Sequence, residues 1–463
     1  MGILVFLKGC APLILYLGGL LSAFMAMSGN VRWALMLVAF LLPLRDVIER
    51  IQTYPLGNQF IDILLIGIII GGILKKKSSN SNVLEKSSIN NIAIITVIYM
   101  LFSLIRGGFF VYGGFSFNVH ESRVQDWKNF SLMPLLFFLN FKNNITKKDV
   151  WIMFAVMCCA IFVVDYYTIN QIREHPSALL SRDQIKGTFQ FLGPNEVAAF
   201  FNESTIILLS VFYAVKKGKY KWLLLILILL NLYCVIFLYS RGAYAGLMIG
   251  MFILFAIKDK NLLIPLFLVL VLWQSVLPQN VVDRIKETKT VSGQLDESSQ
   301  RRIDIWQQAF GYFKSNPIVG IGFGSFRHLG LDLGDTHNIY VKILTEQGLL
   351  GIIIFLFTIF IFLKEGWQLY QKGDDELSKA LGLGFVCCIF VMMVNNLFGD
   401  RWSYLEPNAY LWIFAGLTAR LNIISQTSQV IQPALASEVK TILQSDPLKI
   451  KRRARYYDPQ VKS

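Results

Sequence analysis

Two arginines and one histidine in this sequence are of the types that handle a phosphate-activated substrate. Arg241 interrupts the apolar stretch VIFLYSRGAYAGLMI at 235–249, Arg302 lies in a polar segment, and His337 precedes another apolar run. The planar guanidinium of arginine matches phosphate oxygens with paired hydrogen bonds and stays charged at any relevant pH. Histidine is the usual general base near neutral pH. Together these side chains suit transfer from a phosphate-activated, membrane-embedded donor to a hydroxyl, with the cations stabilising the leaving diphosphate.

The residues around Arg302 and His337 predict how these side chains are presented. Arg302 and Trp306 are four residues apart, so a helix places them on one face. We prefer Arg302 to the adjacent Arg301 because only Arg302 has this spacing to Trp306. His337 stands just before an amphipathic helix that leads into the next apolar run.

A break and a turn are predicted between these two segments. Asn316-Pro317 ends the helix that carries Arg302, and GIGFGSF at 320–326 supplies a flexible turn. This glycine run is not a P-loop, because it lacks the lysine and Ser/Thr ending and the preceding strand.

A second polar segment, at 182–201, adds Arg182 and Lys186 on the same side of the membrane. Glu196 and Glu203 follow inside the next apolar run, seven residues apart and so roughly on one helical face. Ionisable groups in a membrane span are costly and usually face a cavity or a partner. These carboxylates either contribute to the substrate site or pair with nearby arginines for structure.

The composition is that of an integral membrane protein. Hydrophobic residues make up 54% of the 463 residues and charged residues only 16%, against roughly a quarter in soluble domains. The apolar runs are continuous over about 17–22 residues, which favours a helical bundle over a β-barrel. We predict an all-α integral membrane protein, a bundle of about 12–13 transmembrane helices with one long extracytoplasmic loop that contains short helices.

Candidate spans follow from the apolar runs. They cover residues 11–28, 31–46, 58–74, 90–106, 129–141, 150–168, 196–215, 222–239, 243–257, 262–276, 348–364, 380–397 and 408–421. Between Lys221 and Lys258, Arg241 is the only charged side chain, and it lies at the break that must connect two spans. It is either an arginine snorkelling at a helix end or part of a polar cluster at the membrane surface.

The distribution of basic residues predicts which side carries the chemistry. Alternate connections are basic, including KKGKYK at 216–221 and KDK at 258–260, and the tail carries KIKRRAR at 449–455. By the positive-inside rule that side is cytoplasmic. The hinge at Arg241 and the long segment 277–336 then lie on the extracytoplasmic side.

These features divide the chain into five parts. They are N-terminal transmembrane helices (1–180), core transmembrane helices with the arginine hinge (181–276), an extracytoplasmic catalytic loop and amphipathic helix (277–347), C-terminal transmembrane helices (348–421) and a basic cytoplasmic tail (422–463). The segment 277–336 is the longest connection, and long ordered loops in compact proteins are usually functional.

Several other classes of site and partner are disfavoured. The six cysteines fall inside apolar runs without CxxC spacing, so we interpret them as packing residues rather than a disulfide framework or a metal site. The net charge of +14 comes from basic segments between spans, which indicates membrane lipid headgroups and not nucleic acid as the partner. No aspartate cluster lies on the extracytoplasmic side, so we predict a metal-independent reaction without a cofactor.

Four segments together resemble the O-antigen ligase/polymerase family of bacterial proteins, which act on undecaprenyl-diphosphate-linked glycans. They are GTFQFLGPNEVA (187–198), YSRGAYAG (239–246), the Arg302-x-x-x-Trp306 segment followed by NPIVGIGFGSF (316–326), and HNIYVKILTEQGLLG (337–351). With the span pattern, the resemblance covers about residues 180–420. It implies a helical bundle with a large periplasmic loop, and an inverting, metal-independent transfer.

The resemblance also implies roles for individual residues. Arg241 and Arg302 are expected to bind the donor diphosphate, and His337 to act as the base or to orient the acceptor. The remaining candidates for substrate binding are Arg301, Arg182, Lys186, Glu196 and Trp306. The implied partners are an undecaprenyl-diphosphate-linked glycan donor and an acceptor glycolipid, glycan or protein. The implied location is the bacterial cytoplasmic (inner) membrane, with a multi-pass chain and an active site on the extracytoplasmic face.

We therefore predict a membrane glycosyltransferase of the O-antigen ligase type, acting in lipopolysaccharide or other polysaccharide biosynthesis. The same chemistry fits an O-antigen or exopolysaccharide polymerase and a protein O-glycan ligase. We favour a ligase because the extracytoplasmic insertion is modest and ends in one compact element that contains His337. The alternative from another class is a transporter of an anion or a sugar phosphate, with Glu196 and Glu203 in a proton-coupled pathway. Against a transporter, the sequence has no paired internal repeat with interrupted helices.

Overall fold

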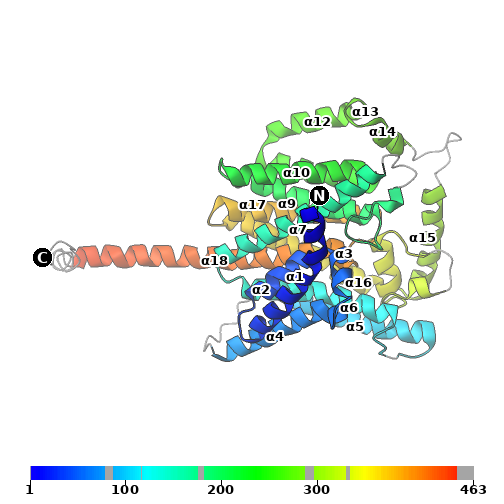
Figure 1. The fold of residues 1–463 in the computed structure, drawn as a ribbon, viewed down its shortest axis with the longest axis horizontal. Coiled ribbons are helices and arrows are strands. Elements are labelled where there is room, and N and C mark those ends of the chain that lie inside the picture. Colours follow the sequence, from blue (N-terminus) through cyan, green and yellow to red (C-terminus); the bar gives the residue numbers. More distant parts are fainter. Residues whose placement is uncertain are drawn as a thin grey trace.

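The computed structural model describes residues 2–78, 87–115, 117–175, 182–286, 297–329 and 334–445, which form helices joined by short connections (Figure 1). The elements in chain order are α1 (Gly2–Met27), α2 (Arg32–Leu41), α3 (Arg45–Ile51), η1 (Gly57–Gln59), α4 (Phe60–Ser78), α5 (Ser88–Tyr112), α6 (Ser122–Asn143), α7 (Lys147–Glu174), η2 (Arg182–Gln184), α9 (Pro194–Ala214), α10 (Lys219–Phe237), α11 (Arg241–Lys258), η3 (Lys260–Leu262), α12 (Leu263–Val271), α13 (Trp273–Val276), α14 (Gln279–Lys286), α15 (Glu297–Ser315), η4 (Phe326–His328), α16 (Ile339–Lys372), α17 (Glu376–Asn395) and α18 (Leu405–Ser445). The predicted all-α class is confirmed for these residues.

The helices that can cross a membrane agree with most of the predicted spans. Among the described residues, 9 helices are long and apolar enough, namely α1, α4, α5, α7, α9, α10, α11, α16 and α17. The predicted spans at 31–46, 129–141, 262–276 and 408–421 fall instead on α2, α6, α12 and α18. Of these, α2 and α12 are short, and α6 and α18 are too polar, so fewer described helices than the predicted 12–13 satisfy this measure.

Helices α9 and α17 lie at the centre of the bundle, where 78% and 72% of their most apolar windows are buried. They pack against each other, and α11 packs against both. A Cβ atom at Gly250 of α11 would lie 2.9 Å from the Ile206 side chain of α9 and even closer to Val391 of α17. Small residues permit this approach of helix backbones within a membrane, where packing rather than the hydrophobic effect holds helices together.

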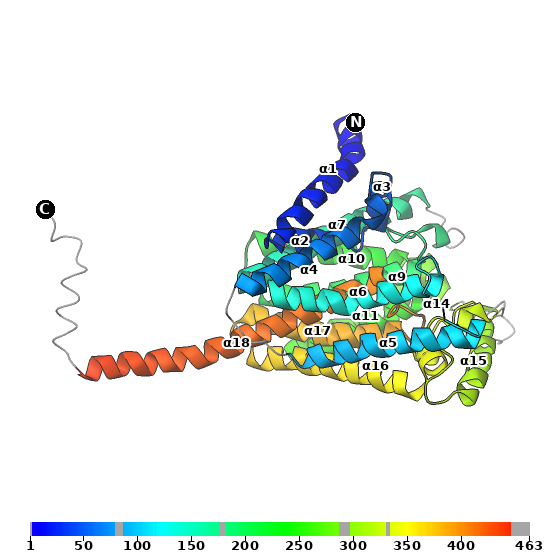
Figure 2. The same ribbon diagram turned by 90° about the horizontal axis from the view of Figure 1, so that it is seen from below.

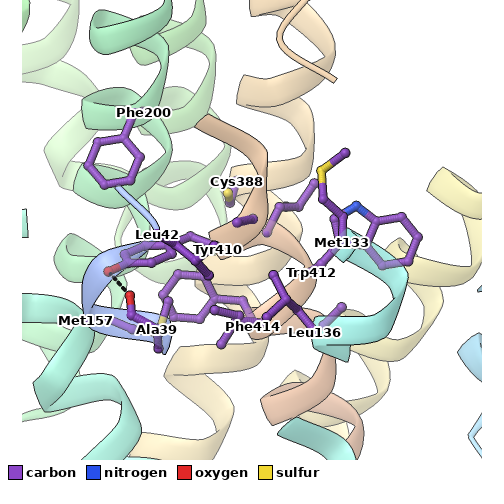
Figure 3. Close-up of a cluster of buried hydrophobic side chains, with 14 of the residues drawn as sticks. Ala39, Leu42, Met133, Leu136, Met157, Phe200, Cys388, Tyr410, Trp412 and Phe414 are labelled. Carbon is purple, nitrogen blue, oxygen red and sulfur yellow. Dashed lines mark hydrogen bonds between the residues drawn. The ribbon is translucent and has the colours of Figure 1, made fainter. Parts of the chain in front are cut away.

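A cluster of buried hydrophobic side chains, several of them aromatic, joins the first and last parts of the chain (Figure 3). The Tyr410 hydroxyl of α18 donates a hydrogen bond of 3.0 Å to the Ala39 carbonyl of α2. The Tyr410 ring also lies 5.5 Å from the ring of Phe200 on α9, and Trp412 meets Phe362 of α16 edge-on at 5.0 Å. These contacts fix α18 within the bundle.

The two ends of the bundle carry different elements. At one end α15 lies across the helix ends, whereas the C-terminal part of α18 projects from the opposite end (Figures 1 and 2). Since α10 runs back between α9 and α11, both of these helices begin at the same end. Helix α16, which packs beside α5 (Figure 2), begins there too and contains a non-helical residue, Gly348 (φ 67°, ψ −162°), that divides it into a short first part and the long span.

Candidate functional site

His337 lies in the short connection before α16, and the residues on both sides of it, Thr336 and Asn338, form hydrogen bonds with other elements. Next to it, Asn338 caps α16, with its side-chain oxygen accepting from the Tyr340 and Val341 amides at 2.9 and 3.2 Å. The Asn338 amide group donates to the Leu397 carbonyl at 3.1 Å. His337 itself has a φ of 50°, a left-handed conformation that is uncommon for a residue other than glycine. Such backbone strain persists only where neighbouring contacts hold it.

Helix α15 supplies one of these contacts. The Trp306 indole nitrogen donates a hydrogen bond of 2.8 Å to the carbonyl of Thr336, the residue before His337. The same helix buries Ile305 and Ala309 in a small apolar cluster with residues of the glycine turn and of α16. This packing anchors α15 against the His337 connection.

Arg302 lies one turn before Trp306 on the same helix, as predicted. Burial is the largest cause that lowers the pKa of His337, and the positive charge of Arg302 lowers it further. Arg302 is half-buried, whereas Arg301 is exposed. The choice of Arg302 over Arg301 as the arginine of the site stays a prediction.

The glycine segment that follows α15 is fixed by hydrogen bonds, so the prediction of a flexible turn is wrong. Arg106 of α5 donates to the Gly320 carbonyl at 2.5 Å and to the Asn316 side chain at 2.8 Å. The Gly322 amide donates to the Glu346 carbonyl of α16 at 2.7 Å. Gly320 and Gly322 have φ values of 66° and 108°, and a Cβ atom on either would clash with the backbone of another helix. Close backbone approach therefore requires glycine here.

The Arg241 hinge and His337 flank the same turn, formed by residues 395–401 between α17 and α18. On one side, the Ile339 amide donates to the Asn396 carbonyl at 3.1 Å. On the other side, a Cβ atom at Gly242 would lie 2.9 Å from the Phe398 side chain. Arg241 is the first residue of α11, and helix N-termini favour anions through their free amides and dipole.

Arg401, at the end of this 395–401 turn, was not singled out from the sequence. Its Nη1 donates to the Asn395 carbonyl at 2.8 Å, and its Nη2 lies 3.6 Å from Glu196 Oε1 in the first turn of α9. Glu196 Oε2 accepts from the Gly193 amide at 3.0 Å. The observed contacts of Glu196 therefore agree with the second alternative, in which this carboxylate pairs with a nearby arginine for structure.

A second ion cluster, also not predicted, ties the His337 connection to the 395–401 turn. Lys342 Nζ lies 2.6 Å from Asp400 Oδ2 and 3.7 Å from Asp335 Oδ1. Burial opposes ionisation of Asp335, but the charges of Lys342 and His337 hold the pKa of this carboxyl below its usual value. The charged form of Asp335 thus persists two residues before His337.

The imidazole of His337 is kept neutral by its surroundings. Burial lowers its pKa, Asp335 raises it, Arg302 lowers it, Glu196 raises it and Arg401 lowers it, and the net result is a pKa below the usual 6.5. At neutral pH the ring therefore has a free nitrogen that can accept a proton. The charges of two arginines and two carboxylates thus act on this one base.

The segment that contains the predicted residues Arg182 and Lys186 forms hydrogen bonds with different elements from those that hold His337. The Lys186 amide donates to the Gln171 side chain of α7 at 2.9 Å, and the Thr188 hydroxyl donates to the Pro43 carbonyl at 2.5 Å. These bonds attach the segment to α7 and to the connection between α2 and α3. Arg182 begins η2, and its side chain lies outside the described residues. Roles for these two cations in substrate binding stay predictions.

Over the part of the chain that the structure describes, no group of three His, Cys, Asp or Glu side chains could hold a metal ion.

No curated protein matches the sequence. Residues 223–356, which include Arg241, Arg302 and His337, match the family model described as O-antigen ligase. This match confirms the predicted resemblance to the O-antigen ligase/polymerase family.

Proposed function

We propose that this protein is a glycosyltransferase that moves a glycan from an undecaprenyl-diphosphate donor to an acceptor hydroxyl. The observation that carries the proposal is the grouping of Arg302, His337 and the Arg241 hinge at one end of a helical bundle, within the matched domain. A donor with a polyprenyl chain would lie in the membrane and present its diphosphate at that end.

The proposed step forms one bond and breaks one. The acceptor oxygen attacks the anomeric carbon of the donor glycan, and the bond from that carbon to the diphosphate oxygen breaks, with its electron pair leaving on the diphosphate. His337 accepts the proton of the acceptor hydroxyl, for which its lowered pKa makes the ring available at neutral pH. Arg302 and Arg241 stabilise the charge on the leaving diphosphate. Attack from the side opposite the leaving group inverts the configuration, and the step as written uses no metal.

Binding of the donor would also assist the base. A diphosphate beside His337 adds negative charge, and nearby negative charge favours the protonated imidazole. The base would therefore become stronger when the donor is in place. Such coupling would suppress proton transfer without a bound donor.

We place the site on the extracytoplasmic side of a bacterial cytoplasmic membrane. The charge distribution supports this, since α11 runs from Arg241 to Lys258 and the basic segments at 216–221 and 258–260 lie at the other end of the bundle. For the acceptor we favour a glycolipid, as in a ligase. A lipid-linked repeat unit, as in a polymerase, and a protein hydroxyl remain the other acceptors to test.

Reconstituted transfer tests the proposal. Proteoliposomes containing the purified protein receive a lipid-diphosphate-linked glycan and, in separate reactions, a lipid A-core acceptor, further lipid-linked units, or an acceptor protein. We expect transfer by the wild type and none by His337→Ala or Arg302→Ala, although both variants still insert. Lys314→Ala is the control, because Lys314 is an exposed cation further along α15. Transfer by His337→Ala at the wild-type rate would remove the base from the mechanism, and extension of lipid-linked units alone would replace ligase by polymerase.

A further inference from the structure

The side chain of Arg401 is held in place but not fully satisfied. Its exposed fraction is only 5%, and the backbone amide and Nη1 of this residue are bound to Asn396 and Asn395 of the same turn. Among the described residues, its Nε has no hydrogen-bond partner. Leaving a buried charged donor unpaired is unfavourable, and such groups in folded proteins usually have a partner to receive them.

The contact between Arg401 and Glu196 is also incomplete. The 3.6 Å between Nη2 and Oε1 exceeds the roughly 2.7–2.9 Å of a charge-assisted hydrogen bond. Glu196 is more exposed than its partner, with 18% of its side chain accessible against 5%. Its other oxygen caps the first turn of α9. The carboxylate therefore neutralises Arg401 without occupying the guanidinium fork.

Arg401 lies where the donor diphosphate would bind under the proposed function. Its charge and that of Glu196 both act on His337, in opposite directions. The turn that holds Arg401 also packs on Gly242, beside Arg241. The unpaired guanidinium nitrogen thus belongs to the same end of the bundle as the proposed base and both proposed phosphate-binding arginines.

We propose that Arg401 is a third arginine of the diphosphate subsite, and that Glu196 is an internal anion that the donor diphosphate displaces from it. This inference rests on the proposed function. Phosphate oxygens offer the guanidinium the paired, short hydrogen bonds that Glu196 does not make. Displacement of Glu196 makes binding selective, because an anion with a single charge competes poorly with a carboxylate that is already in place. The ligand class is therefore a diphosphate ester rather than a simple monoanion.

Binding of farnesyl diphosphate to the detergent-solubilised full chain, measured by isothermal titration calorimetry, tests this inference. Loss of charge-assisted hydrogen bonds should make binding to Arg401→Gln about tenfold or more weaker. Glu196→Gln keeps an oxygen for the Gly193 amide but removes the competing charge, so binding should become about threefold to tenfold tighter. In the double variant the gain from Glu196→Gln should disappear, because it acts through Arg401.

Two control variants separate the possible outcomes. Arg420→Gln removes another buried arginine that also donates to a backbone carbonyl, more than about 20 Å away along α18, and should bind as the wild type does. Arg302→Ala tests the proposed function alone. If Arg302→Ala weakens binding while Arg401→Gln and Glu196→Gln bind like the wild type, this inference is overturned and the proposed function stands. If the wild type binds no farnesyl diphosphate, both fail. If Arg401→Gln does not fold, Glu196→Gln decides, and unchanged or weaker binding by it overturns the inference.

Discussion

Replacing Trp306 by phenylalanine should slow glycan transfer while leaving α15 folded. Phenylalanine keeps most of the ring contacts with the apolar cluster of α15, but it removes the 2.8 Å hydrogen bond to the Thr336 carbonyl. An unpaired buried carbonyl costs about 1–3 kcal/mol. The adjacent His337 has a left-handed φ of 50°, so the lost bond releases the backbone that holds the imidazole in place. An increase of this size in the activation free energy lowers kcat by about 5-fold to about 150-fold.

The assay is turnover in proteoliposomes with saturating lipid-linked donor, measured across a range of acceptor concentrations. Trp367→Phe is the matched control, because Trp367 is 44% exposed and lies near the far end of α16 from His337. We expect near wild-type turnover for this control. Unchanged kcat in Trp306→Phe, or an equal loss in the control, would refute the positioning role of this hydrogen bond.

The remaining predictions concern the base, the backbone and the phosphate contact. Because burial and Arg302 lower the pKa of His337, kcat/KM should fall only as the pH drops below the usual 6.5. Asp335→Asn should move this acidic limb of the pH profile to lower pH, since Asp335 raises the pKa of His337. A shift of the limb to higher pH would contradict the assignment of His337 as the base. Gly348→Ala should lower the free energy of unfolding by about 2 kcal/mol or more, since φ is 67° and a Cβ atom would clash with a carbonyl oxygen. Gly311→Ala, at an exposed position of α15 where a Cβ atom meets nothing, should raise the free energy of unfolding by about 0.5–1 kcal/mol, and denaturation of the purified protein in detergent compares the two variants. Arg302→Lys should retain less than about a tenth of the wild-type transfer rate because lysine lacks the bidentate fork, and near-normal transfer would contradict paired phosphate contacts.

Local patterns in the sequence predicted the elements that carry the site. Helix α15 ends at Ser315, directly before the predicted break, and its four-residue spacing places Arg302 and Trp306 on the side that meets the His337 connection. Helix α11 begins at Arg241, where the apolar stretch was expected to turn back. Helical periodicity and turn-forming residues determine these features, and both can be read within a short window.

Long-range pairs could not be predicted in this way. Lys342 meets Asp400 across 58 residues, and Arg401 meets Glu196, which lies much earlier in the sequence. Nothing in the local sequence of GDRW indicates which carboxylate its arginine will approach. The glycine segment was likewise expected to be flexible, because its rigidity comes from the backbones of α5 and α16 that it crosses.

The most direct measurement of the central claim is an experimental structure of the protein with a bound lipid diphosphate analogue. The proposed function predicts density for the diphosphate between the start of α11 at Arg241 and Arg302 of α15, with His337 beside the anomeric position. A diphosphate bound at the opposite end of the bundle, or beyond the reach of Arg302 and His337 together, would contradict it.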